Sequence, residues 1–207
     1  MTFLIKDAEY ENFVSAYVEA RDLDEGRSAL ESEGYQIIPL EQNAKLRVNN
    51  GGNSSISRIG NWVSEGVIYV KGKGKFLTKK SPILARSPDQ EGKNGNSLYI
   101  NEEQIEFSLK DSFQISDKLG NPFSIPTKRF GEEEIAVFLF GDFAKDYGFF
   151  LKDAKIKNVP FWFADFRDKP FARLLWFDCM DEQSRIVGDG GSVGGFVRGI
   201  KTLDSVS

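Results

Sequence analysis

The sequence predicts an α+β fold, in which one or two N-terminal helices pack on a predominantly antiparallel β sheet, sandwich or partly open barrel. Apolar residues recur at helical spacing near the N-terminus, and from about residue 35 short β-rich segments alternate with turn residues. The chain has 207 residues, of which 40% are hydrophobic and 28% charged. That length is enough for one domain with a substantial core, so we expect a single domain spanning residues 1–207.

The helical segment is predicted to cover residues 7–34. Tyr10, Phe13 and Val14 begin an apolar stripe that predicts a first helix over residues 7–20, with Asp7 as its N-cap. A second helix is predicted from Asp24 to about residue 33, and Gly34 follows it as a left-handed C-cap.

A β-rich body is predicted over residues 35–187. Its strands are expected at residues 35–38, 67–70, 76–78, 98–100 and 105–109, with a hairpin turn at 71–75 and a loop at 87–96. Continuous apolar runs at 135–140, 161–164 and 174–177 indicate strands buried on both faces. The glycine-rich segment 188–207 is predicted to be a loop followed by a short strand.

The composition excludes several kinds of catalytic site. There is no histidine, which removes histidine general bases, histidine-dependent nucleophiles and histidine-ligated zinc. The one cysteine, Cys179, is insufficient for a disulfide or a thiolate zinc site. We therefore predict no cofactor, no metal and no catalytic residue, and we regard an enzyme as the less favoured class.

The N-terminus has neither a basic region nor a long apolar region of the kind found in secretory signals, and no window is apolar enough for a membrane helix. From this and the single cysteine we expect a cytoplasmic protein with no membrane partner.

Charge is distributed unevenly along the chain. The formal net charge is −4, yet residues 42–88 contain nine basic side chains and one acidic one, Glu65, which gives +8 and leaves −12 for the rest. A basic segment in an acidic protein is typical of a face that meets a polyanion. The predicted polyanion-binding residues are Lys45, Arg47, Arg58, Lys71, Lys73, Lys75, Lys79, Lys80 and Arg86.

Three aromatic residues in the same segment, Trp62, Tyr69 and Phe76, would stack on bases if they face outward. The sequence thus predicts a non-enzymatic binding protein whose basic face contacts nucleic acid or another polyanion. A different interpretation of the same lysines is that they protect the tip and edges of a sheet from aggregation.

Two other functions remain open at this stage. The first is a protein-interaction, assembly or regulatory protein, for example from a mobile element, whose aromatic-rich segment 130–177 supplies an interface. The second is a magnesium-dependent enzyme acting on phosphodiesters. Two or three carboxylates would have to converge for this chemistry, and the candidates are Asp142, Asp146, Asp153, Asp165, Asp168, Asp178 and Asp181.

Overall fold

A computed structural model describes residues 4–85, 97–180, 184–188 and 195–203. Its strands are β1 (Leu4–Tyr10), β2 (Phe13–Ala20), β3 (Gln36–Ile37), β4 (Asn61–Val70), β5 (Gly74–Thr78), β6 (Ser97–Tyr99), β7 (Ser112–Ile115), β8 (Phe123–Pro126), β9 (Asn158–Phe163), β10 (Phe171–Phe177), β11 (Ile186–Gly188) and β12 (Gly195–Thr202). Its α-helices are α1 (Leu23–Ser32), α2 (Leu40–Asn50), α3 (Ser55–Arg58), α4 (Glu102–Leu109), α5 (Glu134–Phe140) and α6 (Ala144–Asp153). Short 3-10 helices are η1 (Asp117–Leu119), η2 (Thr127–Glu132) and η3 (Gly141–Phe143).

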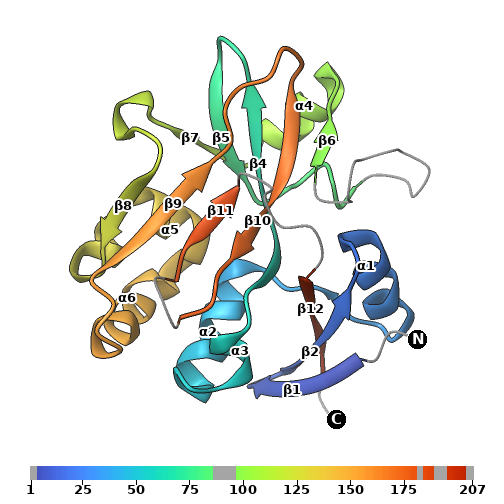
Figure 1. Ribbon diagram of the computed structural model, residues 1–207, viewed down its shortest axis with the longest axis vertical. Coiled ribbons are helices and arrows are strands. Elements are labelled where there is room, and N and C mark those ends of the chain that lie inside the picture. The colour runs from blue at the N-terminus through green and yellow to red at the C-terminus, as the bar shows by residue number, and fades with distance from the viewer. Residues whose placement is uncertain (1–3, 86–96, 181–183, 189–194, 204–207) are drawn as a thin grey trace.

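The described strands form one open sheet, so the α+β class is confirmed (Figure 1). The main strand order is β1-β2-β12-β4-β10-β11-β9-β8, and β3, β5, β6 and β7 pair at its margins. Most pairs are antiparallel, but β12 pairs with β4 in parallel and β11 pairs with β9 in parallel. The late strand β12 therefore lies between the N-terminal hairpin and the rest of the sheet.

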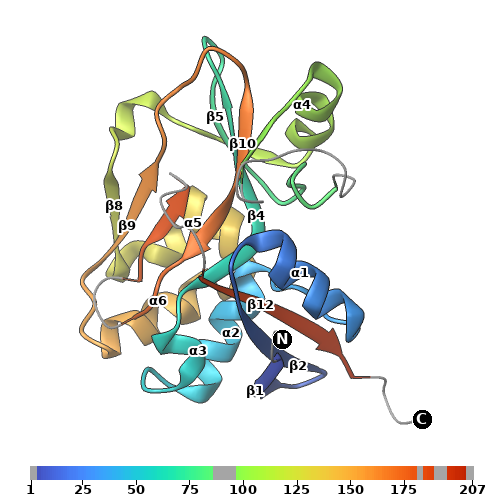
Figure 2. The ribbon, with the colours of Figure 1, turned by 45° about the vertical axis from the view of Figure 1, so that its right-hand side comes forward.

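Helices cover both faces of this sheet. On one face, α2, α5 and α6 pack on alternate residues of β4, β9 and β10, and α5 and α6 lie behind these strands in Figure 1. On the other face, α1 lies across β12 and β2, as Figure 2 shows, and α4 covers the region around β6. Because successive side chains of a strand point to opposite faces, each central strand contributes to two apolar cores. No helix in the described ranges is long and apolar enough to cross a membrane.

The predicted helix over residues 7–20 is wrong. These residues form the β1–β2 hairpin, whose turn includes Glu11 with a φ of 47°. The apolar stripe consists of adjacent pairs such as Phe13-Val14 and Tyr17-Val18. The two residues of each pair point to opposite faces of β2, and other elements pack on both of these faces. A strand packed on both faces can imitate helical spacing.

The second predicted helix is present as α1. Asp22 caps it, since its side chain accepts the backbone N–H of Glu25 at 3.0 Å, and Gly34 follows with a φ of 77°. The hairpin turn at residues 71–75 and the strands at 161–164 and 174–177 are also found, as the β4–β5 connection, β9 and β10. The predicted loop at 87–96 lies outside the described residues.

Two predicted strands are helices. Residues 105–109 belong to α4, which begins with a capping box: Asn101 accepts from the backbone N–H of Gln104, and the Gln104 side chain accepts from the backbone N–H of Asn101. Residues 135–140 belong to α5, where Val137 is exposed while its neighbours fill the core. A short apolar run is compatible with either element, and periodicity alone does not separate them.

Gly26 allows α1 to approach β12 closely. A Cβ at this position would lie 2.7 Å from the Cβ of Val197, which is itself buried. Alanine is favoured over glycine inside a helix by about 1 kcal/mol, but overpacking a core costs about 1–3 kcal/mol. We therefore expect Gly26→Ala to lower the free energy of unfolding in urea, whereas Ser28→Ala on the exposed side of α1 leaves it unchanged or raises it. A stabilised Gly26→Ala protein would contradict this packing.

Candidate functional site: an open aromatic face beside the β9–β10 loop

The eight predicted polyanion-binding residues that the structure describes do not come together on one face. Lys45 is on α2, where it forms an ion pair with Glu41 at 2.8 Å, and Arg58 is on α3. Lys71, Lys73 and Lys75 lie at the β4–β5 hairpin, at the opposite end of β4 from α3 (Figure 1). Lys79 and Lys80 are exposed just after β5, and Arg86 is outside the described residues.

Arg47 is part of the interior. It is fully buried, its Nε donates to Asn43 at 3.0 Å, and one terminal nitrogen donates to the carbonyl of Asp178 at 2.8 Å. Its guanidinium lies 3.7 Å from the ring centroid of Phe177, and burial lowers the pKa of Arg47. Arg47 therefore joins α2 to the segment after β10 and does not reach a surface ligand.

The three predicted stacking residues also pack in the two apolar cores. Trp62 is 4% exposed and meets Trp176 edge-on at 5.1 Å between ring centroids. Tyr69 is buried and stacks on Phe171 at 4.4 Å. Phe76 is half-buried and packs against the core beneath α1 and α4.

The described carboxylates considered for magnesium do not form a metal site. Asp168 pairs with Lys71 at 3.0 Å, and Asp178 pairs with Arg185 at 2.6 Å. Within the described ranges, which omit Asp181, no three acidic or cysteine side chains are grouped so as to hold a metal.

The structure instead reveals a gradient of burial along one row of the sheet. Cross-strand pairing aligns six residues on the face that carries α1, in the order Val18, Val197, Trp62, Trp176, Val187 and Trp162. Val18 and Val197 are buried beneath α1, whereas Trp176 and Val187 are half-buried and Trp162 is 40% exposed. The apolar row thus continues past the edge of α1 onto open surface, and we call Trp162, Val187 and Trp176 the open row.

Neighbouring residues and strand pairing hold the side chains of the open row in place. Gly60 leaves room for the Trp176 indole, since a Cβ there would lie 2.8 Å from that ring. Arg185 lies over the Trp162 ring at 5.6 Å and is fixed by its ion pair with Asp178. Backbone pairing of β9, β11 and β10 sets the spacing of the three side chains. Such side chains lose little conformational freedom when a partner binds, which favours affinity.

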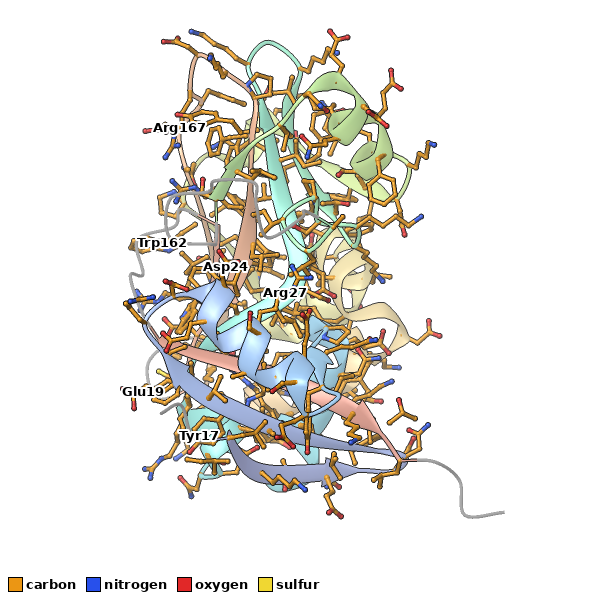
Figure 3. All side chains as sticks on the ribbon, turned by 90° about the vertical axis from the view of Figure 1, so that its right-hand side faces the viewer. Tyr17, Glu19, Asp24, Arg27, Trp162 and Arg167 are labelled. Carbon is orange, nitrogen blue, oxygen red and sulfur yellow. The ribbon has the colours of Figure 1, made fainter. Side chains whose placement is uncertain are left out.

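A surface hollow of about 580 Å³ lies at the β9–β10 loop, further along these strands than the open row. Tyr99, Phe166, Arg167, Asp168 and Lys169 line it. Tyr99 is 59% exposed and Phe166 is 39% exposed, which is unusual for residues of this size. In Figure 3, Arg167 and Trp162 follow each other down one side of the molecule, with Glu19 and Tyr17 of β2 further along the same side.

Sequence reasoning missed this surface because it assigned the whole run Phe161-Trp162-Phe163 to the core. In β9, however, Phe161 and Phe163 are buried while Trp162 points outward. The charged loop that follows, from Asp165 to Lys169, was the available signal that the strand ends at solvent.

Comparison with known proteins supplies one informative likeness. No protein-family model matches the chain, and no curated protein matches it significantly. Among solved structures, the chain is similar to one described as showing the accommodation of massive sequence variation in Nanoarchaeota by the C-type lectin fold. The TM-score is 0.65 and the identity is 18%, over 95% of this chain and 98% of that one.

This likeness corrects the prediction of a basic face for nucleic acid or another polyanion. Neither the similar structure nor the dispersed basic residues point to nucleic acid, so that prediction is wrong. The positive net charge of residues 42–88 is a sum over side chains that are close in sequence but separated in space. One of them, Arg47, is buried. At 18% identity the likeness shows the fold alone: this chain has a fold similar to the C-type lectin fold of that structure.

Proposed function

We propose that this chain is a binding protein that recognises a protein partner through the open row and the hollow at the β9–β10 loop. The observation that carries the proposal is the gradient from buried Val18 to exposed Trp162 along one row of the sheet. An apolar row that runs out from under a helix onto open surface is typical of a site that a partner covers. Tryptophan, tyrosine and arginine are also the residues that most often dominate binding energy at protein interfaces.

The fold supports the same proposal. In the similar structure, the C-type lectin fold accommodates massive sequence variation. For this chain we infer that the exposed side chains of the open row and hollow set specificity, while the cores beneath them set stability. Substitutions of Trp162 and Arg167 would then leave the fold intact, because both side chains are exposed.

A paired set of surface variants tests this function. The face variant carries Trp162→Ala and Arg167→Ala, and the matched control carries Phe149→Ala and Lys152→Ala on the exposed side of α6. Partners captured from extracts of the source organism by the wild-type chain would be identified by mass spectrometry, purified and titrated by calorimetry. We expect the face variant to bind at least about tenfold more weakly than wild type, with the control unchanged.

Unfolding in urea must accompany the titrations, since lost binding is informative only in folded protein. Each double variant should lose no more than about 1–2 kcal/mol. Partner binding that survives the face variant but fails in the α6 control would overturn the proposal.

A further inference from the structure

The hollow contains an arginine whose hydrogen-bonding capacity is unused. The Arg167 guanidinium lies 4.5 Å from the ring centroid of Phe171 and 5.8 Å from that of Tyr99. Both contacts are with ring faces, and Arg167 makes no hydrogen bond or ion pair with another described residue. Guanidinium stacking occupies the flat face of the group and leaves the N–H donors at its edge available.

The surface on which Arg167 rests is rigid. Phe171 is fully buried and stacks on Tyr69, with 8° between the ring planes. The Tyr69 hydroxyl donates to the carbonyl of Gly188 at 2.6 Å and accepts the backbone N–H of Ala164 at 3.1 Å, so it anchors the start of the β9–β10 loop. The Arg167 guanidinium therefore lies over a ring that is itself held in a buried stack.

The charges around the hollow leave a local positive surplus. Asp168 is paired with Lys71, and Asp165 and Asp117 are the two carboxylates that act on Lys75, whose pKa is lowered by burial. Lys75 lies over the Phe166 ring at 5.4 Å, and Lys169 is exposed on the wall of the hollow. Arg167 and Lys169 are both exposed and line the same hollow as the two exposed aromatic residues, Tyr99 and Phe166.

We propose that this hollow binds one carboxylate group carried next to an apolar group, with Arg167 as a two-pronged donor and Tyr99 and Phe166 as apolar walls. A planar guanidinium matches a carboxylate through two parallel N–H···O bonds. Lys169 adds a second positive charge, and the aromatic rings would cover the apolar neighbour. The inference rests on the proposed function, since we take the carboxylate to belong to the partner protein.

Small probes test the hollow independently of any partner. The probes are N-acetylphenylalanine, which has a terminal carboxylate, N-acetylglutamyl-phenylalaninamide, which has a side-chain carboxylate, and N-acetylphenylalaninamide, which has none. Titrations followed by backbone amide shifts of the full chain are expected to perturb residues 166–169. We expect at least one acid to bind roughly tenfold more tightly than the neutral amide, and the stronger acid identifies the source of the carboxylate.

Substitutions of Arg167 separate charge from geometry. Arg167→Gln should abolish the preference for the acid, whereas Arg167→Lys should retain only part of it because an ammonium lacks the planar fork. Lys152→Gln on α6 is the control and should leave all three titrations unchanged. Urea unfolding of each variant confirms that the fold is intact.

The outcomes distinguish the carboxylate site from the wider function. Equal binding of acids and amide, binding of no probe, or an acid preference that survives Arg167→Gln would each overturn the carboxylate site. None of these results affects the partner titrations with the face variant, which test the proposed function separately.

Discussion

Replacing Asp7 with alanine is expected to destabilise the protein by about 3–5 kcal/mol, because it removes the counter-charge of a fully buried arginine. Arg198 of β12 is 0% exposed, and one of its terminal nitrogens donates to the Asp7 carboxylate and, at 2.8 Å, to the Ser15 hydroxyl. The second Asp7 oxygen accepts from Ser55 at 2.6 Å, so the network joins β1, β2, β12 and α3.

An exposed ion pair provides the control. Lys71 and Asp168 also form a close pair, but their side chains are 65% and 98% exposed, so Asp168→Ala should cost at most about 1 kcal/mol. Urea unfolding of both variants measures the difference. The double variant Asp7→Ala/Arg198→Met should recover part of the loss, because it also removes the buried charge. Equal effects of the Asp7 and Asp168 changes would refute this account.

Stability is expected to fall by roughly 3 kcal/mol between pH 4.5 and pH 7 because of Glu65. This carboxyl is buried in β4, and burial raises its pKa from 4.5 to about 7, although it accepts the backbone N–H of Leu40 at 2.9 Å. The folded state therefore binds a proton that the unfolded state has released. The stabilisation is complete below the unfolded pKa and is lost as pH rises through the folded pKa.

Glu65→Gln isolates this effect, since glutamine keeps an acceptor for Leu40 at the start of α2 but does not titrate. The difference in unfolding free energy between wild type and Glu65→Gln should grow with pH and level off above pH 7. The absence of histidine helps, because no imidazole titrates in the same window. A difference that does not change with pH would show that Glu65 has an ordinary pKa.

The sequence allowed the α+β class, α1 and the central strands to be predicted because these depend on local signals. Asp22 and Gly34 mark the two ends of α1, and the glycines at 72 and 74 mark the β4–β5 turn. The β1–β2 hairpin and α5 were mispredicted because their burial depends on distant segments. Phe13 and Val14 are both covered only once β12, α1 and α2 are in place.

The candidate site was harder to predict from the sequence than the fold was. Counting charge along residues 42–88 treats Arg47 and Lys73 alike, but one is buried beside Phe177 and the other is exposed at a hairpin. The open row depends on the pairing of β9 with β11 and of β11 with β10, which no local pattern specifies. Trp162 is distinguishable from Phe161 and Phe163 only after the face covered by α5 and α6 is known.

The position of β12 has a consequence for how the chain is made. Residues 195–202 are the last strand in sequence, yet they pair with β2 on one side and β4 on the other. During synthesis β2 has β1 on one side, but its other edge and the apolar surface of α1 stay uncovered until residues 195–202 have left the ribosome. The two parts of the sheet are expected to join only after residues 195–202 have been made, and chains that stall before residue 195 would keep an open edge suited to unwanted pairing.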